Sequence, residues 1–264
     1  GVAGQFSLGH AGFIAIGSYS GAILGKMMNG LPGLFAGMAV GVVISVIVAF
    51  LVGLPTLRLK GDYLAIATLG VAEIIRVAVT NMKITNGAAG ISGVPLTSTW
   101  TITYIALVLT TILILNYTFS SAGRATYAVL QDEIAAESMG VQVTKYKILA
   151  FVLGAATASI GGTLSATTLG AVTPSDFTFM KSIEVLIIVV FGGIGSFTGS
   201  FVAAVLLGII NLVLQPFGQL RMIIYAVALI LIMIFRPGGL LGTWEFKLGD
   251  FKFSKKKETK ESGK

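Results

Sequence analysis

The stretch from Leu34 to Leu54 contains no charged residue and is almost entirely apolar. A helix of about 20 such residues crosses the roughly 30 Å hydrocarbon core of a bilayer, because a helix satisfies its backbone amides internally. Similar stretches recur along the chain and predict an all-α, polytopic transmembrane helix bundle. The composition agrees, because 11% of the 264 residues are charged, whereas soluble domains carry about 25%.

The apolar stretches and the polar residues between them predict about eight spans. Pro55 is expected to end the second span, and the polar stretch 81–99 is expected to form a loop. Trp100 and Tyr117 lie near opposite ends of the fourth span, where aromatic side chains favour the membrane interface. The predicted spans are residues 11–28, 34–54, 63–79, 100–119, 148–169, 182–191, 201–214 and 220–235.

The sixth predicted helix is too short to cross a bilayer before the glycine-rich stretch FGGIGSFTGS interrupts it. These glycines predict a tight turn, or a broken or re-entrant segment, near Gly192–Gly199. Such backbone is tolerated at membrane depth only where protein covers it or where it lines a watery cavity. Its freed backbone groups are candidates for contact with a polar solute, although close packing of small residues explains the glycines at least as well. The candidates here are Gly192, Gly193, Gly195 and Ser196.

Several functions are disfavoured by residue types that are rare or missing. The chain has no cysteine and one histidine, His10. A disulfide framework and a thiolate metal site are therefore excluded, and zinc would need carboxylate ligands almost alone. The sequence contains no G-x-x-x-x-G-K-[ST] phosphate loop, so no nucleotide is expected to bind this chain. Nucleophile, base and orienting residue do not assemble into a pattern typical of an enzyme.

The net charge is +7, and seven of the 18 Lys and Arg residues are lysines of the C-terminal tail, residues 243–264. We interpret this run as a disordered tail on the cytoplasmic face of an anionic membrane, not as a nucleic-acid site. The preceding residues, 1–242, are expected to form the transmembrane domain. The predicted side that holds the tail also holds most of the Lys and Arg residues, so it is expected to be cytoplasmic.

One segment between two apolar stretches is polar, namely residues 123–140, with the sequence GRATYAVLQDEIAAESMG. Its good helix formers predict one helix over 125–138, and Gly140 stands where a left-handed C-terminal cap fits. Helices that lie on anionic lipid usually carry Lys and Arg on the polar face, whereas this segment is acidic. The segment therefore favours docking to a protein partner. The apolar side chains that fall broadly on one side are Tyr127, Leu130, Ile134 and Met139.

Within this segment, Glu133, Ala135, Ala136 and Gly140 read E-x-A-A-x-x-x-G. This pattern resembles the cytoplasmic loop motif of ABC-importer permeases, in the variant found in branched-chain amino-acid permeases. Further stretches resemble the same family in the same order, and the resemblance extends to about Gly242. These stretches are GQFSLGHAGFIAIGSY, LRLKGDYLAIATLGVAEIIR, TNGAAGISGVP, EVLIIVVFGGIGSFTGS and FRPGGLLG.

The resemblance implies a permease subunit of an ATP-driven importer for leucine, isoleucine and valine in the inner membrane of a prokaryote. The implied partners are ATP-binding cassette subunits on the cytoplasmic face, a second permease that completes a heterodimer, and an extracytoplasmic binding protein. ATP and Mg would bind those partner ATPases, and no cofactor is expected on this chain. Family members usually have at least one more span before the position of Gly1, so we expect nine or more spans in the natural protein.

The same resemblance implies that a loop helix at 120–147 couples ATP hydrolysis to transport. The small side chains of Ala135 and Ala136 would let this helix seat closely in the ATPase, and Gly140 would let the chain turn sharply back. The coupling residues implied are Arg124, Gln131, Asp132, Glu133, Ala135, Ala136 and Gly140.

Three charged or polar residues elsewhere are weaker candidates for the translocation path. His10 near the start of the first helix is more often a hydrogen-bonded structural residue. Glu73 and Arg76 are three residues apart, so a local ion pair explains them without a substrate. Two other functions remain open, namely an ABC permease for urea, short amides or another small polar solute, and an ion-coupled secondary transporter. The second usually needs an acidic residue deep in the bundle.

Overall fold

A computed structural model describes residues 4–5, 7–28, 30–57, 59, 61–193, 195–214, 218, 223, 224 and 227. The chain divides into two compact units, residues 1–190 and 191–264. Among the described residues, nearly all regular structure is α-helical, as the sequence predicts. The predicted span 220–235 and the tail 243–264 lie almost wholly outside the described residues.

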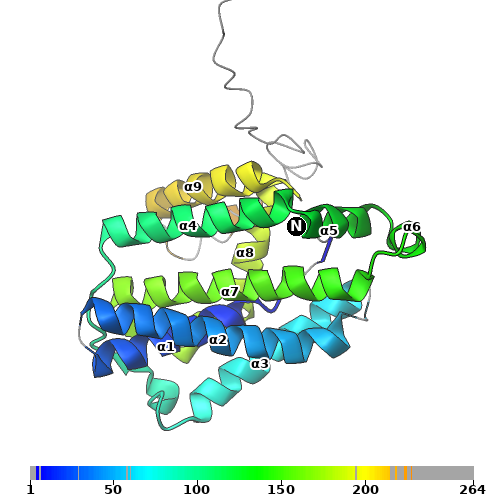
Figure 1. Cartoon of the computed structure of the whole chain (residues 1–264). Helices are drawn as coiled ribbons and strands as arrows, with labels where there is room; N and C mark the ends of the chain where they lie inside the picture. The colour runs from blue at the N-terminus through cyan, green and yellow to red at the C-terminus, as the bar shows by residue number, and fades with distance from the viewer. Residues whose placement is uncertain are drawn as a thin grey trace, which may run out of the picture. The chain divides into compact units, whose positions relative to one another are not determined.

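Three helices form the core of the first unit: α1 (His10–Met27), α2 (Leu31–Thr56) and α7 (Val143–Leu169) (Figure 1). Small residues let their backbones approach closely, as expected where no hydrophobic force drives helices together in lipid. A Cβ added to Gly17 would lie 1.9 Å from the carbonyl oxygen of Ser159, so only glycine fits there. The Thr163 hydroxyl donates across the same contact to the carbonyl of Gly17 at 2.9 Å.

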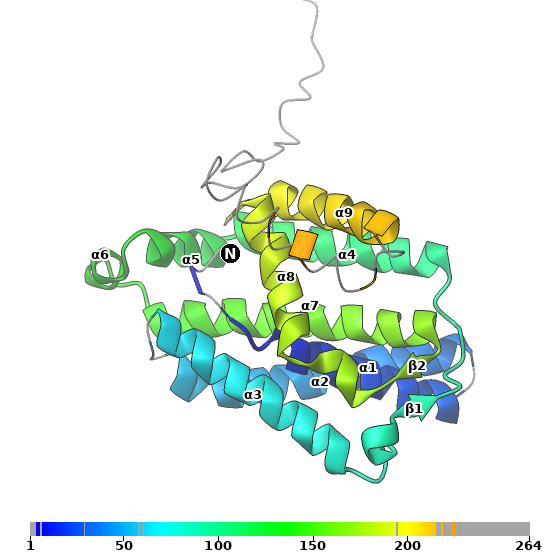
Figure 2. The ribbon, with the colours of Figure 1, turned by 180° about the vertical axis from the view of Figure 1, so that it is seen from behind.

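Two further long helices, α3 (Asp62–Asn81) and α4 (Trp100–Phe119), lie outside this core. At one end of the unit, the loops after α3 and α7 pair through β1 (Ile91–Ser92) and β2 (Ala171–Val172) in antiparallel register. The single turns η1 (Gly87–Ala89) and η2 (Pro174–Phe177) flank these strands. Figure 2 shows α8 (Phe179–Gly192) running across the direction of α4 and α7.

Five described helices are long and apolar enough to cross a membrane: α2, α3, α4, α7 and α9 (Phe197–Leu214). Helix α1 is outside this set, but it is the most enclosed helix, with twelve of its 18 residues buried. Helix α8 has 14 residues and is too short. The count of eight spans therefore stays a prediction, while a bundle that crosses the membrane several times agrees with the structure.

Three local predictions were wrong. Residues 125–138 do not form one helix, because Asp132 is extended (φ −156°, ψ 113°) and separates α5 (Ser121–Gln131) from α6 (Glu133–Ser138). Pro55 does not stop α2, which continues to Thr56; at this position the missing proline N–H costs only one bond of the last turn. Helix α7 begins five residues before the predicted start, at Val143.

In the second unit, the glycine-rich turn breaks the helix as predicted. Gly193 and Gly195 have positive φ angles of 117° and 91°, which other residues rarely adopt. The hydroxyl of Ser196 then accepts a hydrogen bond from the N–H of Gly199 at 3.0 Å, in the first turn of α9. A local turn therefore explains these glycines.

Candidate functional site

The predicted coupling segment lies at the end of the first unit opposite the two short strands, where α5 and α6 connect α4 to α7 (Figure 2). The hydroxyls of Tyr117 in α4 and Thr126 in α5 are 2.6 Å apart, and this hydrogen bond holds α5 against the end of α4. The buried side of α5 consists of Gly123, Thr126 and Val129.

Helix α6 has only six residues, too few to be stable by itself, so its caps matter. At its start, the Asp132 carboxylate accepts hydrogen bonds from the N–H groups of Ile134 and Ala135, at 2.8 and 3.0 Å. At its end, Gly140 adopts the predicted left-handed conformation, with a φ of 83°. The N–H groups of Gly140 and Val141 donate to carbonyls of the last turn, which completes a Schellman cap.

An ion pair joins α6 to the first turns of α7. Lys147 is buried, and its ammonium contacts the Glu133 carboxylate. Ala136 is also buried, at 6% exposure. Two of the predicted coupling residues, Glu133 and Ala136, are therefore directed at the chain itself. Lys147 was missed in the sequence, because residues 143–147 were expected to precede the helix.

The other predicted coupling residues are exposed, and together with three apolar side chains they form the outer face of the loop. Arg124 is exposed and its guanidinium donates to the carbonyl of Phe119 at 3.0 Å, at the end of α4. Most of the apolar stripe noted in the sequence points outward: Tyr127, Ile134 and Met139 are 52%, 76% and 84% exposed. The exposed predicted residues are Arg124, Gln131, Asp132, Ala135 and Gly140.

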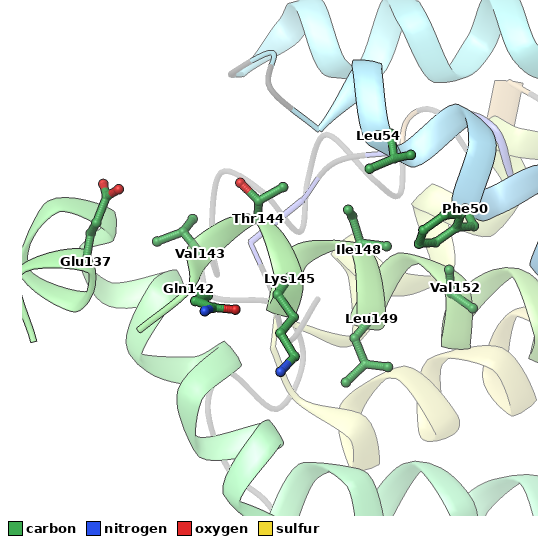
Figure 3. A pocket seen from close by; sticks show the side chains of 10 residues that line it. All are labelled: Phe50, Leu54, Glu137, Gln142, Val143, Thr144, Lys145, Ile148, Leu149 and Val152. Carbon is green, nitrogen blue, oxygen red and sulfur yellow. The ribbon is translucent and has the colours of Figure 1, made fainter. Parts of the chain in front are cut away.

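Beside α6, an open groove of about 760 Å³ runs between the end of α2 and the start of α7 (Figure 3). Its apolar side chains come from both helices, with Phe50 and Leu54 on α2 and Ile148 on α7. Its polar side chains include Glu137 of α6 and Lys145 of α7. The groove therefore lies next to the outer face of the loop and adds a concave, largely apolar surface beside it.

His10, the first residue of α1, lines a smaller cavity of about 200 Å³. The cavity lies between the segment before α1, the last turns of α4 and the middle of α7. The other polar residues that line it are Gln5, Ser7, Tyr117, Thr118 and Thr157. Sequence reasoning missed all of these, although polar residues directly before an apolar helix, as in GQFSLGHAG, are a usable indication.

The remaining candidates for the translocation path are not brought together with His10 in the described structure. Glu73 and Arg76 lie on α3, where they pair with each other; two of the contacts are hydrogen bonds from Arg76 Nε to the Glu73 carboxylate oxygens, at 3.1 and 2.9 Å. Their side chains are 48% and 29% exposed. The turn residues Gly192, Gly193, Gly195 and Ser196 belong to the second unit.

Several long apolar helices, small residues at their contacts, and a capped loop helix at one end together define a polytopic helical membrane protein. Residues 1–235 match the family described as "Branched-chain amino acid transport system / permease component", and the chain belongs to this family. The chain is 36% identical to the high-affinity branched-chain amino acid transport permease LivM of Salmonella typhimurium and 34% identical to LivM of Escherichia coli K12. Both alignments cover 91% of this chain.

The chain spans 64% of the length of these two LivM relatives. The permease protein LivH of Escherichia coli K12 is 30% identical over 54% of this chain and 46% of its own length. No solved structure was found to match the chain.

Proposed function

We propose that this chain is a membrane-spanning permease subunit of an ATP-driven (ABC) importer for branched-chain amino acids. The observation that carries the proposal is α6, a short helix capped at both ends that presents exposed apolar side chains outside the bundle. A helix held in this way is suited to transmit the movement of a partner subunit to the helix bundle. Family membership supports the substrate class, because the similar proteins are named as branched-chain amino acid permeases.

In the proposed mechanism, ATP-binding subunits with bound ATP and Mg hold the outer face of the loop in a cleft on the cytoplasmic side. Ile134 and Met139 provide apolar area, and burying each such side chain contributes about 1.5–3 kcal/mol. Asp132 and Glu137 are exposed around them. The complementary surface would therefore be an apolar cleft with basic residues at its rim.

Closure of the ATPases would move α6, and the Glu133–Lys147 pair would transmit that movement to α7. Helix α7 packs against α1 and α2 along the core. Displacement of α7 would therefore change the packing of the whole bundle. Such a change is needed to close the translocation path on one side of the membrane and open it on the other.

The remaining partners and the location follow from the same assignment. A second permease would complete a heterodimer, and an extracytoplasmic binding protein would deliver the amino acid to the end that carries β1 and β2. The inner membrane of a prokaryote would then hold the chain, with the loop and the C-terminus in the cytoplasm.

The substitution Ile134→Asp tests the coupling role. Introducing a carboxylate into an apolar contact should lower ATP-dependent leucine uptake at least about tenfold, while the amount of the complete transporter in the membrane stays the same. Leu59→Asp is the matched control, because Leu59 is 41% exposed and lies in the turn between α2 and α3. Unchanged uptake by the Ile134 variant would refute the coupling role.

The unmodified transporter, assayed with its partners in membrane vesicles, tests the substrate and the energy source. We expect leucine uptake that requires ATP and survives collapse of ion gradients. Uptake of urea but not of leucine would show that the substrate is a small polar solute and not a branched-chain amino acid. Uptake driven by an ion gradient without ATP would identify a secondary transporter instead.

A further inference from the structure

We propose that the cavity between residues 5–10, α4 and α7 is a binding subsite for an aliphatic amino acid on its way through the membrane. This proposal rests on the proposed transport function and adds the site at which the chain holds its cargo. Four observations carry it: irregular backbone inside the bundle, a cavity of suitable size, a lining divided into polar and apolar parts, and an unpaired amide donor.

The described residues between Gly4 and Gly9 are not helical, although Gln5 and Ser7 line a cavity together with residues of α4 and α7. The N–H of Leu8 donates to the Thr68 hydroxyl at 3.0 Å, and Thr68 lies about 9 Å inside the start of α3. A Cβ added to Gly9 would lie 2.8 Å from the carbonyl oxygen of Thr68, so the two backbones touch. Irregular backbone at membrane depth is tolerated where protein covers it or where it lines a hydrated cavity.

The cavity measures about 200 Å³, which is below the roughly 300–1,000 Å³ of sites for drug-sized ligands. A small solute therefore fits it better than a peptide or a nucleotide does. On α7 it reaches from Ala150 to Thr157, in the middle of that 27-residue helix. A solute held there would lie inside the membrane, beside the helix that the coupling segment contacts.

The lining has an apolar part and a polar part. Ile114 of α4 and Phe151 and Leu153 of α7 line the apolar part, which matches an aliphatic side chain. Apart from His10, the polar part contains neutral side chains, because no Asp, Glu, Lys or Arg is among the described residues that line the cavity. An amino-acid zwitterion also has no net charge, so hydrogen bonds to its two ends can replace countercharges. Urea has no apolar portion that could pack against the apolar part of the lining.

The polar groups supply both donors and acceptors. The side-chain nitrogen of Gln5 is buried and has no hydrogen-bond partner in the described part of the chain, which leaves a donor free for a carboxylate. Thr118 and Thr157 donate their hydroxyl protons to carbonyls one turn earlier, so their oxygens are left as acceptors for an ammonium group. The His10 side chain lines the same cavity.

Cysteine labelling tests this assignment directly, since the chain contains no cysteine. In membranes that contain the complete transporter, we expect Thr157→Cys to react with a small water-soluble methanethiosulfonate. Millimolar leucine should slow the reaction at least about fivefold, and equal urea should not. Gly161→Cys is the control on the same helix, because Gly161 is exposed and no atom lies within 4 Å of its Cβ position; leucine should not change its labelling.

Filling the cavity gives an independent test. A Cβ at Gly154 would lie 3.7 Å from His10 Nε2, so Gly154→Ala fits, whereas the longer side chain of Gly154→Leu would occupy the site. We expect Gly154→Leu to lower leucine uptake at least about tenfold, with membrane abundance kept, and Gly161→Leu to transport normally. If Gly154→Leu fails to assemble, the labelling of Thr157→Cys still decides the question.

The two proposals fail in different ways. If the unmodified transporter takes up leucine with ATP but Thr157→Cys is unreactive, or reacts at a rate that leucine does not change, the subsite is refuted and the transport function stands. If the unmodified transporter takes up no leucine, the transport function itself is refuted.

Discussion

Helix α7 has two stretches that differ in chemistry. Its first turns hold α6 through the buried Lys147, and the contact there is ionic and supported by helix caps. Its middle lines the small cavity through Gly154 and Thr157, and no Asp, Glu, Lys or Arg is among the described residues of that lining. A charged contact thus lies where the helix meets α6, and neutral hydrogen-bonding groups lie where it would meet the proposed solute.

In the proposed transport cycle, this one helix would take part both in coupling and in binding of the solute. A buried ion pair loses much when one partner is removed, so it holds α6 to α7 in a defined geometry. A neutral cavity binds weakly enough to release a solute. Because a packed helix moves largely as a unit, displacement at Lys147 reaches Thr157 about 15 Å farther along the axis. The predictions below separate the two stretches.

The largest effect is expected from breaking the ion pair. Glu133→Gln leaves the ammonium of Lys147 buried without its counterion, which costs on the order of 3 kcal/mol before some relief from solvent. Lys147→Met should cost less, because the Glu133 side chain is 35% exposed and can turn to water. We expect ATP hydrolysis to persist while leucine uptake falls. Partial recovery of uptake in the exchanged pair, Glu133→Lys with Lys147→Glu, would separate this contact from general misfolding.

Next in size is the backbone at Gly140. A β-branched residue is strained at its φ of 83°, so Gly140→Val should destabilise the cap by about 1–2 kcal/mol. No atom lies within 4 Å of the added Cβ, so the cost comes from the backbone alone. Gly140→Asn is the matched variant, because asparagine tolerates this region better. Equal uptake by the valine and asparagine variants would show that the cap does not matter for coupling.

A smaller effect is expected at the other cap. Asp132→Ala removes the acceptor for two N–H groups of α6 and should cost about 1 kcal/mol, whereas Asp132→Ser keeps a capping oxygen. Faster hydrogen exchange at the amides of Ile134 and Ala135 in the alanine variant would measure the loss. Exchange that does not change would mean that Lys147, not the cap, holds α6.

The spanning helices were predictable because length, apolar content and breaks at glycine and polar residues determine them. The break at Asp132 was missed because it lies among strong helix formers, where one capping side chain competes with local propensity. Which of Ala135 and Ala136 faces outward depends on the contact with α7, and spacing alone does not contain that information. The cavity was missed for a similar reason, since Gln5 and Thr157 meet only after the chain has folded.

The smallest effect is expected at Glu73 and Arg76, which test whether charge at a third place matters. The two residues form an ion pair within α3, and the double variant removes both charges together, so neither is left without its counterion. Because neither residue lines the small cavity, the double variant Glu73→Gln with Arg76→Gln should change leucine uptake less than about twofold. A larger loss, with normal abundance and normal labelling of Thr157→Cys, would instead put the pair on the path. The small cavity would then be one of two sites on the translocation path, and the two stretches of α7 would account for only part of that path.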